Sequence, residues 1–246
     1  MTGSRLVRRL KPWRNTKRAN DTALVMKFAA VLFDCDGVLV DSEPITNGVL
    51  RLMLNERGWA ISQDECMRVF VGKAVKDEIP QIESKTGFVV TPAWLAEFAE
   101  RRNHALNERV VAIPNVIDAV RQVHSRYKGQ IACASGADRA KVVLQLGKIG
   151  LLDCFEGRIF SGYETPRSKP FPDVYLAAAA ALNVKAADCA VVEDTVPGVT
   201  AGVAAQATVF AYTPPSTLHV SPGQLALAGA RHQFTDMAHL PALLMA

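Results

Sequence analysis

Two aspartates one residue apart, Asp34 and Asp36, have types and a spacing that could do chemistry. They directly follow the apolar run 28–33 (FAAVLF), and Gly37 comes next. One carboxylate can attack phosphorus and become an aspartyl-phosphate, while the other donates a proton to the leaving oxygen and later takes one from water. Gly37 lets the backbone turn and point N–H groups at a phosphate. Because Asp is also common in ordinary turns, this pair alone is weak evidence.

Two further groups could bind a phosphate. Ser135 and Gly136 close the apolar run 130–134 (QIACA), and they offer a hydroxyl and an N–H at the start of a predicted helix. Lys169, which precedes Pro170, can neutralise charge on phosphoryl oxygens and on the first aspartate. Taken singly, each is better explained as a loop dipeptide or a solvated lysine.

A second acidic pair, Glu193 and Asp194, closes the apolar run 189–192 (CAVV). Carboxylate oxygens are ligands that Mg²⁺ prefers, although acids also favour the N-termini of helices. Chance capping does not predict acid, hydroxyl, lysine and acid at four separate strand ends. Together these groups indicate one site for phosphate and Mg²⁺.

The elements that must position these residues alternate between strand and helix. We expect strands at 28–33, 130–134, 158–160, 189–192 and 207–211, and helices at 115–126, 137–147, 172–182 and 196–205. This order predicts an α/β fold, a Rossmann-like parallel sheet covered by helices on both faces. In such sheets the site lies at the carboxyl ends of the strands. Residues 213–223, rich in Pro and Ser, are expected to form a surface loop.

The segment between the Asp34–Asp36 pair and Ser135 differs from the rest of the chain in its predicted secondary structure. It predicts helices at 43–57, 64–70, 74–85 and 92–107, with Thr91 and Pro92 as a helix start, and no strand interrupts it. We therefore expect residues 27–42 and 109–246 to form the catalytic core and residues 43–108 an inserted all-helical domain. Residues 1–26 are predicted to be a basic, disordered extension.

The composition of the chain bears on the cellular location of the protein. The chain has 246 residues, 49% of them hydrophobic, and no apolar run approaches the length of a membrane span. The five cysteines form no C-x-x-C pair, and buried free thiols in a reducing cytoplasm are the simplest account. We expect a cytoplasmic protein, with a monomer as the default state.

The positive charge of the chain is concentrated at its beginning. The net charge is +4, but residues 1–20 hold seven Lys or Arg and no acid, which leaves −3 for the rest. Such an arm can bind nucleic acid or an anionic surface, or serve as a transit peptide. We favour an incidental extension, with Met26 as the natural start. We expect neither nucleic acid nor membrane as a partner.

The string D-C-D-G-V-L-V-D-S-E, which begins at Asp34, resembles the first motif of the haloacid dehalogenase-like hydrolase superfamily. Ser135-Gly136, the run K-P-F-P-D from Lys169, and Glu193-Asp194 resemble the second, third and fourth motifs, and they occur in that order. The resemblance covers roughly residues 27–240.

This resemblance implies a nucleophile, Asp34, and a general acid/base, Asp36. It also implies Mg²⁺ bound by the Asp34 carboxylate, the Asp36 carbonyl oxygen and Asp194, with Glu193 in or next to the coordination sphere. The dehalogenases of this superfamily lack the second aspartate, because their substrates need no protonated leaving oxygen. Phosphate esters are therefore the expected substrates.

The helical insertion is similar to the cap of the subfamily that includes phosphoglycolate phosphatases, sugar-phosphate phosphatases and β-phosphoglucomutases. Such caps close over the site and contact the rest of the substrate. We expect substrate contacts from Glu43, Asn47, Lys73 and Lys76, although a solvated helix start or surface explains these residues as well. Arg101, Arg102 and His104 are expected to be solvated.

The activity that follows is a Mg²⁺-dependent phosphatase acting on a small phosphorylated metabolite, a sugar phosphate or a sugar-acid phosphate. Residues 160–170 resemble phosphatases that act on 6-phosphogluconate. A phosphosugar mutase of the β-phosphoglucomutase type stays open, as does a non-catalytic binding module. Asn115 and Gln206 stand where the family usually has Gly, which we expect to concern backbone geometry.

Overall fold

A six-stranded parallel sheet forms the centre of the larger lobe in the computed structural model, which describes residues 26–215 and 220–245. The strand order is β5-β4-β1-β6-β7-β8, and all neighbouring strands are parallel. The strands are β1 (Ala30–Phe33), β4 (Ile131–Ser135), β5 (Ile159–Ser161), β6 (Cys189–Glu193), β7 (Thr208–Tyr212) and β8 (His232–Phe234). The predicted α/β fold is confirmed.

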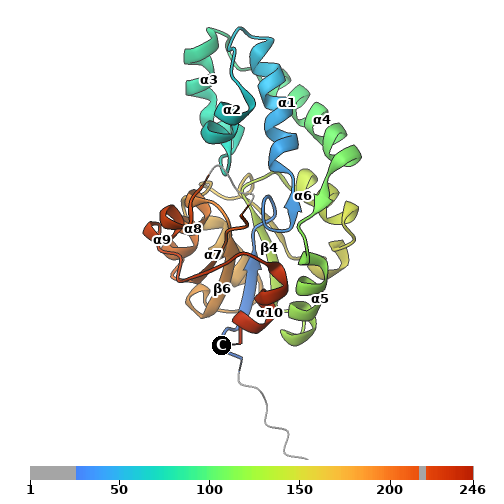
Figure 1. Cartoon of the computed structure of the whole chain (residues 1–246), viewed down its shortest axis with the longest axis vertical. Coiled ribbons are helices and arrows are strands. Elements are labelled where there is room, and N and C mark those ends of the chain that lie inside the picture. The colour runs from blue at the N-terminus through green and yellow to red at the C-terminus, as the bar shows by residue number, and fades with distance from the viewer. Residues whose placement is uncertain (1–25, 216–219, 246) are drawn as a thin grey trace, which may run out of the picture.

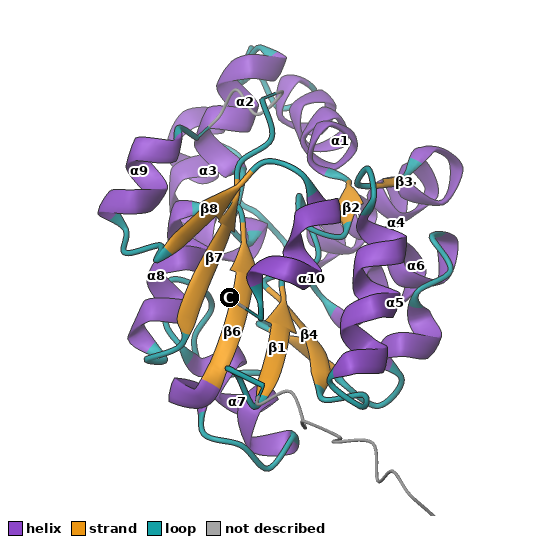
Figure 2. Ribbon diagram, turned by 60° about the horizontal axis from the view of Figure 1, so that its bottom comes forward, coloured by secondary structure: helices purple, strands orange, loops and turns teal. Residues whose placement is uncertain are grey.

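Helices cover both faces of this sheet, because successive side chains along a strand point to opposite sides. Val31 and Phe33 of β1 belong to one hydrophobic cluster with α5, α6 and α10, whereas Ala30 and Leu32 belong to another with α7, α8 and α9 (Figure 2). The helices are α5 (Val116–Arg126), α6 (Arg139–Lys148), α7 (Asp173–Ala181), α8 (Val196–Ala204), α9 (Pro222–Leu227) and α10 (Leu240–Leu243), with 3-10 turns η2 (Leu152–Phe155), η3 (Ala186–Asp188) and η4 (Met237–His239).

A second lobe stands on the sheet lobe and consists of helices (Figure 1). Its elements are α1 (Glu43–Asn55), α2 (Gln63–Phe70), η1 (Val75–Glu78), α3 (Ile79–Thr86) and α4 (Pro92–Arg109). They share a separate hydrophobic cluster that includes Leu54, Phe70 and Ile82. Residues 43–108, all described, contain no strand. We call this segment the cap.

Two short strands join the lobes. β2 (Val40–Asp41) leads into α1, β3 (Val111–Ala112) leaves α4, and the two pair antiparallel. The sequence did not predict them, because two residues are too few to show a periodicity. Their pairing holds the two connections side by side beneath the cap.

Several predicted boundaries were wrong for local reasons. The helix expected at 74–85 is two elements, η1 and α3, and the break falls beside Pro80, which begins a helix more readily than it continues one. Helix α6 begins at Arg139 rather than at 137, because Asp138 caps it by accepting from the Lys141 N–H (3.0 Å). The expected loop 213–223 runs into α9 at Pro222, and residues 216–219 lie outside the described part.

Other expectations can be checked directly. Asn115 and Gln206 both have left-handed backbones, with φ of 64° and 67°, so the two departures from Gly do concern backbone geometry. All five cysteines are buried and free. Among the described helices, none combines the length and apolarity needed to cross a bilayer. The expected extension lies outside the described residues, apart from Met26.

Candidate active site

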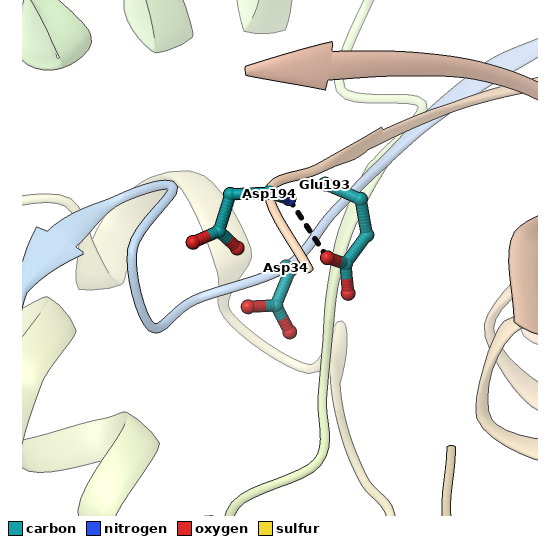
Figure 3. Close-up of side chains that lie close together, drawn as sticks. All are labelled: Asp34, Glu193 and Asp194. Atoms are coloured by element: carbon teal, nitrogen blue, oxygen red, sulfur yellow. Dashed lines mark hydrogen bonds between the residues drawn. The ribbon is translucent and has the colours of Figure 1, made fainter. Parts of the chain in front are cut away.

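The carboxyl ends of β1 and β6 bring three acidic side chains together. Phe33 and Val192 are in register on these neighbouring strands, so the residues that follow them, Asp34 and Glu193, emerge side by side. Figure 3 shows the side chains of Asp34, Glu193 and Asp194 close together. Each places a carboxylate oxygen within 4.8 Å of the others. All three residues are buried. The structure thus joins the first and fourth predicted motifs.

Lys169 places its ammonium group between two of these carboxylates. Its Nζ lies 2.6 Å from Asp34 Oδ1 and 2.8 Å from Glu193 Oε1, and 4.8 Å from the centre of the Tyr175 ring. Burial alone would lower the pKa of Lys169, but the two carboxylates outweigh it and hold the pKa above its usual value. The third motif therefore contributes a charged lysine directly beside Asp34.

Glu193 has both carboxylate oxygens occupied by donors. Oε1 accepts from Lys169 Nζ and from the Tyr175 hydroxyl (3.1 Å). Oε2 accepts from the N–H groups of Asp194 (2.8 Å) and Thr195 (2.9 Å) and from the Thr195 hydroxyl (3.0 Å). These five hydrogen bonds assign Glu193 to holding the lysine and the turn after β6. Its role as a direct metal ligand stays a prediction.

Asp194 shows the opposite situation. Its Oδ1 is buried and has no hydrogen-bond partner among the described residues. Gly37, with φ of 79°, makes room for this side chain, since a Cβ there would lie 2.1 Å from Asp194 Oδ2. The Gly37 N–H donates to the Val40 carbonyl oxygen (2.9 Å), so the turn itself uses this donor. A phosphate contact by Gly37 stays a prediction.

The charges at this point favour a bound cation. Burial raises the pKa of Asp34 to about 7, an effect that Lys169 partly offsets and that Glu193 and Asp36 reinforce. Burial, followed by the charges of Glu193 and Asp34, also raises the pKa of Asp194. Because a divalent cation would relieve this repulsion and satisfy the orphaned oxygen, Asp34 and Asp194 fit Mg²⁺.

Asp36 is held in a different way. Its Oδ1 accepts from the Ser42 hydroxyl and from Gln145 Nε2 (2.8 Å), and it lies 2.8 Å from Lys141 Nζ. Burial alone would raise the pKa of Asp36, but Lys141 and the hydrogen bonds outweigh it and lower the pKa. The two aspartates of the first motif therefore have pKa values shifted in opposite directions.

Ser135 and Gly136 lie at the end of β4, beside this group. Both line the same cavity as Asp34, and the Ser135 hydroxyl oxygen accepts from the Ala137 N–H (3.1 Å). Gly136 was expected at a helix start, but the helix begins three residues later, so this glycine belongs to the loop. A phosphate contact from either residue stays a prediction.

A cavity of about 80 Å³ lies between the core and the cap. The cap lines it with Glu43, Asn47, Phe70, Lys73, Phe98 and Arg102, among others. Asn47 Nδ2 donates to Glu43 Oε2 (2.8 Å), and burial, with the nearby charge of Asp36, raises the pKa of Glu43 to about 7. Lys76, also expected here, instead sits 4.1 Å from the centre of the Tyr163 ring, and that tyrosine lines the cavity.

The cap is seated on the core around this cavity. Its loop packs so closely that a Cβ on Gly72 would lie 2.9 Å from Thr195 Cβ. On the other side, Arg102 Nη2 lies 2.8 Å from Asp138 Oδ2. Contacts that cross from one lobe to the other therefore border this small cavity.

Arg102 was expected to be solvated, and that expectation was wrong. The residue is 5% exposed, while its neighbour Arg101 lies at the surface. Arg102 follows Phe98 by four positions and Trp94 by eight, so it shares their buried face of α4. This spacing was the signal that could have found it. Sequence analysis also missed Ser42, Lys141, Gln145, Tyr163 and Thr195.

Comparisons with known proteins agree with this geometry. A family model described as haloacid dehalogenase-like hydrolase matches residues 28–206. The 6-phosphogluconate phosphatase of Escherichia coli (strain K12) is 29% identical over 189 residues, which cover 75% of this chain and 82% of that protein. The phosphorylated carbohydrates phosphatase of Thermotoga maritima is 27% identical over 180 residues, covering 72% and 81%.

A solved structure shares the fold over nearly the whole chain. The HAD family hydrolase from Deinococcus radiodurans R1, determined with bound phosphate and sodium, is 33% identical and has a TM-score of 0.69. The superposition covers 89% of this chain and 96% of that one.

Proposed function

The chain belongs to the haloacid dehalogenase-like hydrolase family as a phosphatase, and we propose that it hydrolyses a small phosphorylated sugar or sugar acid with the help of Mg²⁺. The observation that carries this proposal is the position of Asp34. Its carboxylate lies at the end of β1 beside Lys169 and Asp194, and Asp34 lines the cavity between core and cap with Asp36 and Ser135.

We assign the two aspartates successive tasks. An Asp34 oxygen forms a bond to phosphorus while the ester P–O bond breaks, and the electron pair leaves with the sugar oxygen. Asp36 gives that oxygen a proton, so this step uses the protonated form of Asp36, which its lowered pKa makes the minor form at neutral pH. In the second step Asp36 takes a proton from water as the water oxygen attacks phosphorus, which releases phosphate and restores Asp34. Lys169 and Ser135 would stabilise charge on the phosphoryl oxygens.

The metal would be held by Asp34, Asp194 and the carbonyl oxygen of Asp36. When bound, Mg²⁺ would screen the repulsion between the anionic nucleophile and an anionic phosphate. Glu193 supports this arrangement from behind, because its five hydrogen bonds fix Lys169 and the turn that carries Asp194.

The cap wall supports a polar, hydroxyl-rich substrate. Glu43 and Asn47 present hydrogen-bonding groups to the cavity. Among the described residues, Arg102 donates to Asn103 and Asp138 from Nε and Nη2, which leaves Nη1 for a ligand. A guanidinium suits a carboxylate, so we favour a sugar acid. Two relatives act, by name, on 6-phosphogluconate and on phosphorylated carbohydrates.

The cellular location, the partners and the oligomeric state are also part of this proposal. All five cysteines are buried free thiols, which suits a reducing cytoplasm. Residues 21–246 carry no positive excess, which gives no reason to expect a nucleic acid or an anionic membrane as a partner. We propose a monomer that acts on a small metabolite.

A substrate panel tests the proposal. The full chain in Mg²⁺ should release phosphate from 6-phosphogluconate or glucose 6-phosphate, and Asp34→Asn should release none, whereas the exposed Asp41→Asn should behave like wild type. A wild type inactive on every phosphate, including 4-nitrophenyl phosphate, would contradict it. Isomerisation of β-glucose 1-phosphate in place of phosphate release would identify a mutase instead.

A further inference from the structure

A buried lysine outside the four motifs contacts the general acid/base assigned above. Lys141 lies on α6 in the core, is 5% exposed, and places Nζ 2.8 Å from Asp36 Oδ1. We propose that Lys141 is a positioning residue, which anchors one oxygen of Asp36 so that the other faces the leaving group of the substrate. The inference rests on the proposed function.

The donors around Asp36 converge on a single oxygen. The Ser42 hydroxyl, Gln145 Nε2 and Lys141 Nζ all bind Oδ1. No hydrogen bond to Oδ2 is recorded among the described residues, and Asp36 lines the cavity. A carboxylate held in this way cannot rotate freely, so its second oxygen is the one available for proton transfer.

Helix α6 supplies two of the three donors. Lys141 and Gln145 are four residues apart and therefore lie on the same face of the helix. The Cys35 thiol donates to Gln145 Oε1 (3.4 Å), which orients the amide so that its NH₂ group points to Asp36. The N-cap of this helix, Asp138, also binds Arg102 of the cap. The position of Lys141 is thus set by the core and by the seated cap.

Stability alone is a poor reason for this arrangement. A buried ion pair contributes little net stability compared with apolar packing, because both charges lose their hydration. The pair also acts locally, because it restricts the orientation of the Asp36 carboxylate and places a positive charge beside it. The pair keeps Asp36 in one orientation where this residue lines the cavity.

A competing role for Lys141 would be direct binding of the substrate phosphate, because it also lines the cavity. The two roles differ in their dependence on the leaving group. A phosphate ligand would assist every phosphate ester equally. A residue that positions Asp36 would assist esters of poor leaving groups, such as sugars, and would matter little for 4-nitrophenolate, which leaves without a proton.

The test compares kcat/KM for glucose 6-phosphate and 4-nitrophenyl phosphate, since this ratio reports the steps up to loss of the leaving group. We expect Lys141→Met to lower the value for the sugar phosphate at least about tenfold more than for the aryl phosphate, a part of the about 10²–10⁴-fold that a general acid contributes. Lys141→Arg should restore part of the loss. Lys148→Met, on the exposed side of the same helix, should change neither value.

A double-mutant cycle completes the test. In an Asp36→Asn background, Lys141→Met should cause no further selective loss, and this pair also avoids an unpaired buried charge if the single variant folds poorly. Gln145→Leu should show the same selectivity to a smaller degree. Equal losses on both substrates, or a full additional selective loss in the Asp36→Asn background, would overturn the inference. A wild type inactive on every phosphate of the panel, including 6-phosphogluconate and 4-nitrophenyl phosphate, would overturn the proposed function and this inference with it.

Discussion

The two sides of the cavity are built differently. We call the side formed by core residues such as Asp36 and Glu193 the floor, and the side formed by the cap the roof. In the core, Glu193 accepts five hydrogen bonds and Asp36 holds three donors on one oxygen. In the cap, Glu43 and Asn47 bind each other, and Lys73 pairs with Glu78 at the surface. A densely bonded floor suits one fixed reaction, and a sparsely bonded roof leaves donors and acceptors for a substrate. Damage to the floor should therefore affect every substrate, and damage to the roof should change selectivity.

The largest effect is expected from the most heavily bonded residue of the floor. Glu193→Gln removes one of the two counter-charges of Lys169 and places an NH₂ group among donors. We expect a loss of about 3–5 kcal/mol in the free energy of unfolding, measured in urea. Glu164→Gln, which breaks an exposed pair with Arg139, should cost at most about 1 kcal/mol. Similar losses for both variants would show that the floor is not specially held.

A divalent cation should stabilise the floor only where its ligands are intact. We expect Mg²⁺ at about 100 times its dissociation constant to raise the free energy of unfolding of wild type by about 2.7 kcal/mol. Asp194→Asn should show little of this gain, because it removes a charged ligand. The measurement is thermal unfolding with Mg²⁺ and with EDTA, and an equal gain in both proteins would exclude Asp194 as a ligand.

Substitutions in the cap should change the selectivity between substrates. Arg102→Met should lower kcat/KM for 6-phosphogluconate more than kcat/KM for glucose 6-phosphate. The difference should correspond to about 1.5–3 kcal/mol of transition-state stabilisation, the contribution of a hydrogen bond to a charged group. Arg101→Met is the matched control, since that side chain is exposed and pairs with Glu56 and Glu97. Steady-state kinetics on both substrates decide the point. A loss shared equally by the two substrates would give Arg102 a purely structural role.

The smallest effect concerns how the roof seats on the floor. Gly72 and Gly58 both have positive φ, 75° and 85°, so Ala should cost each about 1–2 kcal/mol of backbone strain. Only at Gly72 would the new Cβ meet Thr195, whereas nothing lies within 4 Å of one at Gly58. We expect kcat/KM to fall severalfold for Gly72→Ala alone. Equal kinetics for the two variants would show that this contact does not seat the cap.

The contrast between floor and roof also explains what the sequence could predict. Asp34 and Asp194 directly follow strand ends, and parallel strands deliver such residues to one edge of the sheet whatever the details of packing. The alternation of strands and helices predicted that edge. The short strands β2, β3 and β8 were missed, and β2 and β3 have only two residues each, which carry no periodicity.

Helical residues were harder to place. Lys141 and Gln145 share a face of α6, but nothing in their spacing says that this face meets Asp36 rather than solvent. For Arg102 the apolar spacing from Trp94 and Phe98 did carry a signal, which its charge obscured. Which polar helical side chain is buried depends on how segments distant in the sequence pack together, and that information is not local.

The central claim, that Asp34 attacks the substrate phosphorus, is tested most directly by locating the phosphoryl group. The full chain would be mixed with substrate and Mg²⁺, quenched rapidly in acid, digested and examined by mass spectrometry. We predict one phosphoryl group on Asp34 in the wild type, and none on the corresponding peptide of Asp34→Asn. Turnover by the wild type with the phosphoryl group found on another residue, or on none, would contradict the account.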